Sequence, residues 1–313
     1  MLIQESDRLF RQQLYRLMKY FIILLLIIRF TGTALAFDPD KPASHYQVEE
    51  LCRPDSGQRF PTPLFTFYMG VSLVFISGHN QLNSPSATGT RYHFRDDFHF
   101  PSYRLVPRFN LFIKLSESNR LLFSVYNIQN SANTTLRQDL QFGNLLFPAN
   151  GEVYARTRLR SALIGYNHAF MNRERGDLGF MLGLSGLHFQ NEVRTRNQPE
   201  LIRKTDSNWL LLPSIGLASG MYIKRNIYVR GIIDYFSMGM RHYDFTIFNF
   251  KPTIEFYLYK NLGFALRYHY SYNRISQIPW SNYHGEIKLH SHAFSVVLCY
   301  RMLKKKDRIN HVY

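Results

Sequence analysis

The chain has 313 residues, of which 45% are hydrophobic and 16% aromatic, and its formal net charge is +16. Its mean hydropathy of −0.24 argues against a bundle of membrane helices, but a membrane barrel averages to such a value because lipid-facing and inward residues alternate. A basic chain suits an anionic partner, yet no basic helix, zinc-ligand spacing or aromatic–basic RNA motif is present, so we expect no nucleic acid partner.

Residues 1–36 have the features of a secretory signal region. Lys19 precedes the apolar run Tyr20–Ile28, and an Ala-Leu-Ala cleavage pattern follows at 34–36. The run is shorter than the ~20 residues of a membrane-spanning helix. Met18 would begin a signal of ordinary length and is an alternative start, and a buried apolar helix is the alternative interpretation of the run.

Three further regions follow the signal. Residues 37–62 are polar with four prolines and are expected to form a periplasmic lead-in. Residues 63–302 alternate with a period of two, which indicates strands. Residues 303–313 form a basic C-terminal tail.

The alternation predicts ten strands, each with one apolar and one small or polar face. They are expected at 65–76, 103–115, 121–130, 153–170, 178–185, 209–223, 227–235, 248–258, 262–273 and 291–300. Short turns at 117–119, 172–176, 224–226 and 260–261 alternate with longer segments at 78–100, 131–152, 191–207 and 277–285. The sequence therefore predicts an all-β fold, a single antiparallel up-and-down transmembrane β-barrel. The 241–244 connection is short where a long one is expected, so eight or twelve strands are alternatives.

Periodicity alone also permits a soluble β-sandwich with the apolar faces packed inside. The signal region, the strand lengths and the alternating turn lengths favour a barrel in the bacterial outer membrane instead. Aromatic residues near strand ends, among them Tyr257, Tyr259 and Tyr300, are expected to form an interfacial girdle. Outer-membrane lipid is accordingly an expected partner.

Three stretches carry a resemblance: Phe142–Pro148, Arg158 to Phe170, and Gly179 to Phe189. Together they resemble uncharacterised Gram-negative outer-membrane β-barrel proteins, over about residues 90–300, which implies the fold and the location. The strand at 291–300 resembles the C-terminal assembly signal of such proteins, which implies the barrel assembly machinery as a partner. The basic tail departs from that pattern, so either the signal tolerates an extension or the last strand lies elsewhere.

Inward parity gives candidates for a polar network in the lumen: Arg104, Arg108, Arg230, Asp234, Lys251, Glu255, Arg267 and His269. In one interpretation, Asp234 and Glu255 neutralise some of the cations, and the barrel is largely plugged with a structural or surface-interaction role. Because basic residues outnumber acids, the alternative is a small anion-preferring channel.

Catalysis is a third alternative, and whether the protein is an enzyme stays open. His269 and Ser271 lie two residues apart, with Glu255 on the preceding strand, and could supply a base, a nucleophile and an orienting acid. The His-x-Ser spacing resembles that of outer-membrane lipid A deacylases, whose Ser-Asn motif is missing. The hypothesis is a lipid A-acting hydrolase or acyltransferase. Because the parity turns His269 and Ser271 away from lipid, such an enzyme would need an acyl pocket inside the barrel.

Three arginines, Arg156, Arg158 and Arg160, share one parity with Ile164 and Tyr166. If that parity faces outward, they lie above the apolar belt and suit the phosphates of lipopolysaccharide. A solvated strand end, or a bulge that turns them inward, is the alternative.

The two cysteines, Cys52 and Cys299, lie far apart in the sequence and both on the periplasmic side of the expected fold. A disulfide between them would pin the lead-in beneath or inside the barrel, and two unpaired cysteines are the alternative. No CxxC motif or Cys/His cluster is present, so we expect neither a metal site nor a cofactor.

Overall fold

A computed structural model describes residues 63–84, 88–173, 175–196, 203–240, 243–276 and 284–303. Within these ranges all regular structure is β-strand, and no helix there is long and apolar enough to cross a membrane. The signal region 1–36, the lead-in 37–62 and the tail beyond Leu303 lie outside the described residues.

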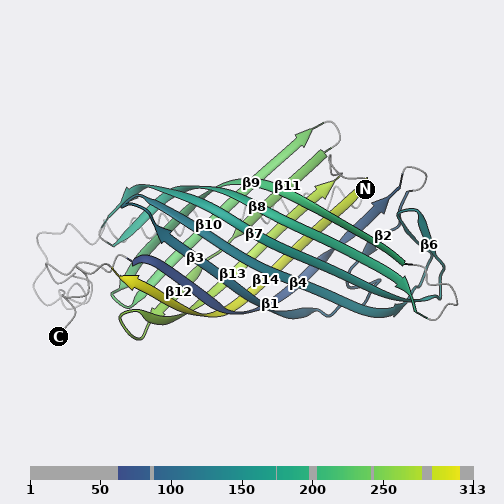
Figure 1. The fold of residues 1–313 in the computed structure, drawn as a ribbon, viewed down its shortest axis with the longest axis horizontal. Coiled ribbons are helices and arrows are strands. Elements are labelled where there is room, and N and C mark those ends of the chain that lie inside the picture. The colour runs from purple at the N-terminus through teal and green to yellow at the C-terminus, as the bar shows by residue number, and fades with distance from the viewer. Residues whose placement is uncertain are drawn as a thin grey trace, which may run out of the picture. The chain divides into compact units, whose positions relative to one another are not determined.

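The strands form one closed antiparallel barrel with ten strand positions around its wall, as predicted (Figure 1). We call each position a stave, and two consecutive strands together occupy one of them. The staves are β1 (Pro63–Asn83), β3 (Tyr103–Lys114), β4 (Asn119–Thr135), β7 (Glu152–Asn172), β8 (Gly176–Thr195), β9 (Arg203–Lys224), β10 (Ile227–Met240), β11 (Tyr243–Phe250) with β12 (Thr253–Tyr257), β13 (Leu262–Ser276) and β14 (His284–Leu303). β14 pairs with β1 from Leu303↔Pro63 to His284↔Asn83, which closes the barrel and leaves no edge strand.

β11 and β12 are two halves of one stave, interrupted only at Lys251 and Pro252. Lys251 exchanges both backbone hydrogen bonds with Ile232 of β10, and the Pro252 carbonyl accepts from the Tyr268 amide of β13. Pro252 has no N–H to donate, so the ladder breaks there without a change of register.

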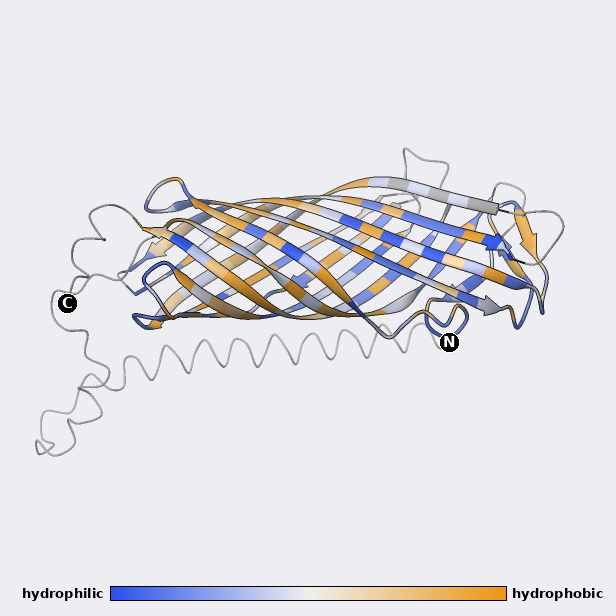
Figure 2. Ribbon diagram, turned by 60° about the horizontal axis from the view of Figure 1, so that its bottom comes forward, coloured by the Kyte–Doolittle hydropathy of each residue, from blue (hydrophilic) through white to orange (hydrophobic). Residues whose placement is uncertain are grey.

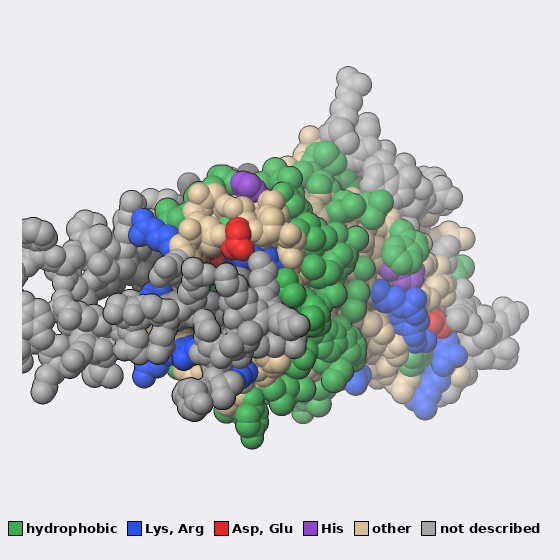
Figure 3. Space-filling view, turned by 60° about the vertical axis from the view of Figure 1, so that its left-hand side comes forward, with side chains coloured by type: hydrophobic (Ala, Val, Ile, Leu, Met, Phe, Trp, Pro, Cys, Tyr) green, Lys and Arg blue, Asp and Glu red, His purple; other side chains and the backbone are tan. Residues whose placement is uncertain are grey.

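In the half of the barrel with the short turns, apolar side chains face outward. Leu105 and Ile215 are 70% and 61% exposed, whereas the inward Tyr68 and Ser72 are fully buried. In Figure 2 the strands of this half carry many hydrophobic segments. Figure 3 shows hydrophobic side chains as a band across the visible face, with lysines and arginines on both sides of it. We call this band the apolar belt and identify it as the lipid-facing surface.

Toward the opposite end, where the long connections lie, the polarity of the strands that continue beyond the belt reverses. On β8 the outward Phe180 and Leu184 are exposed, but further along the inward Leu187 and Phe189 are the buried apolar residues. The residues between and beyond them on the outer face, such as His188, are polar. Water outside and an apolar filling inside explain this reversal, and the switch marks the outer boundary of the belt.

The reversal also explains where the sequence prediction of strand ends was wrong. The four short turns are confirmed, each lying between consecutive staves. The segment 191–207 was expected to be a connection, yet β8 continues to Thr195 and β9 begins at Arg203. Tyr257 was expected in the aromatic girdle but lies inside, 5% exposed, whereas Tyr259 and Tyr300 are exposed.

Candidate functional site

The middle of the lumen is a polar layer at the level of the apolar belt. The structure places every candidate of the predicted network on the inner face: Arg104 and Arg108 on β3, Arg230 and Asp234 on β10, Lys251 between β11 and β12, Glu255 on β12, and Arg267 and His269 on β13. Alternation in antiparallel strands puts these side chains in one enclosed space, although they are remote in sequence.

The two acids of this layer each hold one cation. Asp234 accepts from Nζ of Lys251 at 2.9 Å and from the side-chain amide of Asn249. Glu255 is 1% exposed and lies 3.8 Å from Nε of Arg230. It also accepts hydrogen bonds of 2.6 Å from the hydroxyls of Tyr68 and Tyr257. Most of these charge-assisted bonds join neighbouring strands, whereas the bond from Tyr68 on β1 reaches past β13 and β14 to β12.

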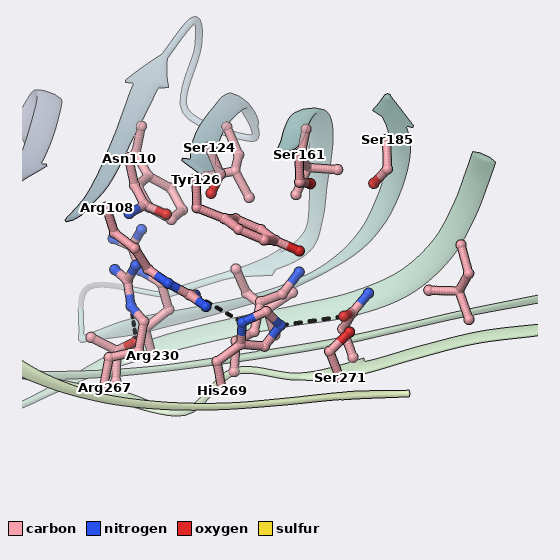
Figure 4. A pocket seen from close by; sticks show the side chains of 18 of the residues that line it. Arg108, Asn110, Ser124, Tyr126, Ser161, Ser185, Arg230, Arg267, His269 and Ser271 are labelled. Atoms are coloured by element: carbon pink, nitrogen blue, oxygen red, sulfur yellow. Dashed lines mark hydrogen bonds between the residues drawn. The ribbon is translucent and has the colours of Figure 1, made fainter. Parts of the chain in front are cut away.

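Arg108 and His269 form the second part of the layer (Figure 4). Arg108 donates to Nδ1 of His269 at 2.8 Å, and the Arg108 guanidinium lies 4.8 Å from the Tyr126 ring centroid. Nε2 of His269 lies 3.3 Å from Oδ1 of Asn249. Since Nδ1 accepts, the ring proton is on Nε2, and both imidazole nitrogens are engaged.

The residues suggested for catalysis do not form a triad. Glu255 bonds Tyr68 and Tyr257, whereas His269 bonds Arg108 and Asn249. Ser271 accepts from the side-chain amide of Asn273 at 3.0 Å. His269 and Ser271 are both buried on the inner face, away from the lipid-facing surface. This arrangement lacks a base oriented by an acid beside a nucleophile.

A hydrophobic core fills the lumen above the polar layer, and the sequence analysis did not predict it. The core combines inward residues of the staves with residues of the long connections; its fully buried members include Phe98, Phe142, Phe147, Leu210, Phe245 and Ile287. Six aromatic residues in the connections, Tyr92, Phe94, Phe98, Phe100, Phe142 and Phe147, were the available signal, because solvated loops rarely carry so many.

Two short elements hold three of these aromatic residues, Tyr92, Phe142 and Phe147, in the core. They are β2 (Arg91–His93), which pairs with the end of β1, and the hairpin β5 (Leu140–Phe142) and β6 (Leu145–Phe147). The other three aromatic residues follow β2. Gly143 turns the hairpin with φ of 64°, a conformation that suits glycine. Its amide donates to the carbonyl of Leu82 on β1 at 3.1 Å, and this bond fixes the hairpin over the barrel.

The three arginines proposed for lipopolysaccharide face outward on β7. Arg160 pairs with His188 of β8, which pairs with Trp209 of β9, and this row lies at the outer edge of the apolar belt. Arg156 and Arg158 lie above it, and both donate to Oε1 of Gln129 at 2.8 Å. No bulge interrupts this part of the strand, since the register shift of β7 lies between Ala169 and Met171.

An ion cluster lies on the outer face of β13, β14 and β1, beyond the belt. Glu286 lies 3.6 Å from Nε2 of His79, 3.2 Å from Arg91 and 3.1 Å from Arg274. The pKa of the Glu286 carboxyl is lowered from 4.5 to about 2. The largest cause is the His79 imidazole, the two arginines contribute less, and partial burial opposes the shift. The carboxylate is therefore charged at any physiological pH.

The described residues bear only partly on the cysteine pairing and on the expected absence of a metal site. Cys299 is buried on the inner face of β14, while Cys52 lies outside the described residues, so their pairing stays a prediction. In the described part of the chain, no group of three or more His, Cys, Asp or Glu side chains is arranged to hold a metal ion.

Comparison with known proteins gives a fold but no sequence relative. No family model and no curated protein matches the chain. Among solved structures, the outer membrane protease OmpT from Escherichia coli matches with a TM-score of 0.52 and 7% identity, over 79% of this chain and 99% of that chain. The P. putida toluene transporter TodX matches with a TM-score of 0.31 and 7% identity, over 81% and 92% of the two chains.

The attachment invasion locus protein Ail of Yersinia pestis matches with a TM-score of 0.32 and 9% identity, over 75% of this chain and 99% of that chain. At such identities the OmpT alignment bears on the fold alone. The closed barrel, its apolar belt and this alignment agree: the chain folds as a ten-stranded β-barrel of the Gram-negative outer-membrane type.

Proposed function

We propose that this protein is a closed, non-conducting outer-membrane barrel with a structural or surface-interaction role. The observation that carries the proposal is the double filling of the lumen. The polar layer ties Asp234 to Lys251 and Glu255 to Arg230, and the hydrophobic core packs above it, with Phe142 and Phe147 fully buried. An ion would have to cross a packed apolar layer, where desolvation is costly.

Single-channel recording in planar bilayers tests this closure. The purified full-length protein is expected to insert without stepwise currents, while a general porin under the same conditions conducts. Steady single-channel openings of the wild-type protein would contradict the proposal. They would favour the anion-preferring channel, to which the cationic excess of Arg104, Arg108 and Arg267 points.

We further propose that the outer face of the barrel binds lipopolysaccharide. Arg156, Arg158 and Arg160 lie in consecutive outward positions at the edge of the belt, and the row of Arg160 continues through His188 to Trp209. Guanidinium groups form bidentate bonds with phosphate, and an aromatic side chain at this level suits the interface between acyl chains and headgroups.

A pair of matched variants tests the lipid proposal. Replacement of the three arginines by Gln is expected to lower the amount of lipopolysaccharide that co-purifies with the barrel. The control replaces Lys224, Arg225 and Lys260 by Gln, because these residues lie in turns at the opposite end of the barrel. Equal retention of lipopolysaccharide by the two triple variants would contradict a specific role for the arginines.

A further inference from the structure

The polar layer contains more buried positive charge than its acids neutralise. Asp234 pairs with Lys251 and Glu255 with Arg230. Arg108 and Arg267 have no carboxylate partner among the described residues, although they are only 5% and 9% exposed. Two guanidinium groups are therefore buried at the level of the membrane with no carboxylate within ion-pair distance among the described residues, and the two acids of the layer each already pair with another cation.

The partners that these guanidinium groups do have are neutral. Arg108 bonds His269 and lies over the ring of Tyr126. Arg267 donates to Oγ1 of Thr253 at 3.1 Å and lies 5.1 Å from the ring centroid of Tyr68. Such contacts orient a guanidinium group but supply no negative charge of their own, and a buried cation without a close counter-ion is costly in an interior of low dielectric constant.

Two buried donors in the same layer have no hydrogen-bond partner in the described part of the chain. They are Nε of Arg108 and the side-chain amide nitrogen of Asn110. Both residues line a cavity of about 50 Å³, together with Arg230, Lys251, Arg267 and His269. By the volume that one water needs, this cavity has room for roughly three or four water-sized particles.

We propose that this cavity binds a monatomic anion of the halide class, with chloride as the physiological candidate, between Arg108 and Arg267. The anion would neutralise the excess charge and accept from the unpartnered donors of Arg108 and Asn110. It would be a fixed structural ligand that holds β3 to β13, so the inference goes beyond the closed-barrel proposal and does not depend on it.

Refolding from urea into detergent micelles tests the proposal, because the anion can then enter while the barrel forms. Chloride, bromide or phosphate replaces gluconate at constant ionic strength, and the midpoint of heat-induced unfolding is measured. Chloride and bromide are expected to raise the midpoint by several degrees in a saturable manner, and phosphate is not. A midpoint that does not respond to either halide would overturn the proposal.

Variants separate the site from a general salt effect. Arg108→Met and Arg267→Met are expected to lose the halide response, while Arg104→Gln keeps it, because Arg104 bonds Asn130 and does not line the cavity. An undiminished response of a folded Arg108→Met or Arg267→Met would overturn the site. Crystals of wild type that was refolded in bromide are a second test, which holds even if both variants fail to fold. An anomalous peak beside Arg108 and Arg267 is expected, and its absence would count against the proposal.

Discussion

Arg108 on β3 donates a hydrogen bond of 2.8 Å to Nδ1 of His269 on β13, although β1 and β14 lie between these strands in the barrel wall. The bond therefore crosses the lumen. It fixes His269 as a neutral acceptor, with its remaining N–H directed at Asn249.

Loss of this acceptor is expected to destabilise the barrel. His269→Leu leaves a buried guanidinium donor without its partner, which costs about 1–3 kcal/mol of unfolding free energy. Urea unfolding of the refolded protein in lipid vesicles measures the change. Ser271→Ala, two residues along the same inner face, is the control and should cost less. A His269→Leu variant as stable as wild type would show that the bond contributes nothing.

The same arrangement predicts that His269 has no role in lipid chemistry. Lipid A from cells that carry His269→Ala or Ser271→Ala should have the same mass spectrum as lipid A from wild-type cells. The physical reason is that both side chains face the interior of a closed barrel and that Arg108 and Asn249, not an acid, orient the imidazole. A deacylated or newly acylated species that depends on His269 would revive the enzyme hypothesis.

Glu255 should be among the most sensitive positions of the lumen. Glu255→Gln removes the carboxylate that Tyr68, Tyr257 and Arg230 share, and leaves Arg230 as a buried charge without a counter-ion. Breaking a buried pair in this way costs about 3–5 kcal/mol. Glu117→Gln removes the exposed carboxylate that pairs with Lys114 in a short turn, and should cost about 0–1 kcal/mol. Similar urea midpoints for the two variants would refute the prediction.

Acid should weaken the ion cluster around Glu286. Its pKa is about 2 when folded and 4.5 ordinarily, so the carboxylate contributes stability above about pH 4.5 that is lost as the pH falls toward about 2. The melting temperature of wild type should exceed that of Glu286→Gln at about pH 6, and the difference should shrink toward zero by about pH 2. A difference independent of pH would indicate that packing, not charge, is what the variant changes.

The two faces of the β5–β6 hairpin offer a matched pair of variants. Phe142 is fully buried in the hydrophobic core, whereas Leu146 on the same hairpin is 52% exposed. Phe142→Ala should cost about 3–5 kcal/mol and open the connections to protease while the belt stays folded. Leu146→Ala should leave the cleavage rate close to that of wild type. Equal cleavage of the two variants would mean that the hairpin is not anchored through the core.

The sequence sufficed for the barrel because the apolar belt imposes a strict alternation. Phe67 and Met69 against Tyr68, or Phe294 and Val296 against Ser295, are read directly from the period of two. The eight candidates for the lumen followed from the same parity. The contacts between these eight side chains did not follow from it. Parity says which face of its strand a side chain is on, but not how deep in the lumen it lies or which other strand it contacts.

The hydrophobic core escaped prediction for a different reason. Beyond the belt, the apolar parity of a strand moves from the outside to the inside, so Leu187 and Phe189 break the pattern that Phe180 and Leu184 set. A break in alternation resembles the end of a strand, and the predicted strands were accordingly too short. The aromatic connections would have signalled the filling only if these segments had been read as packed structure.

The change of polarity along β8 also acts as a depth marker. Lipid must stop near the level of His188, because the outward side chains of β8 are polar from there to the end of the strand. From Leu187 to the end of β8 at Thr195, tilted strand geometry gives a rise of about 20 Å. The paired strands therefore continue beyond the lipid with a polar outer face. They hold the connections away from the bilayer, so a partner could reach the connections without approaching the bilayer surface.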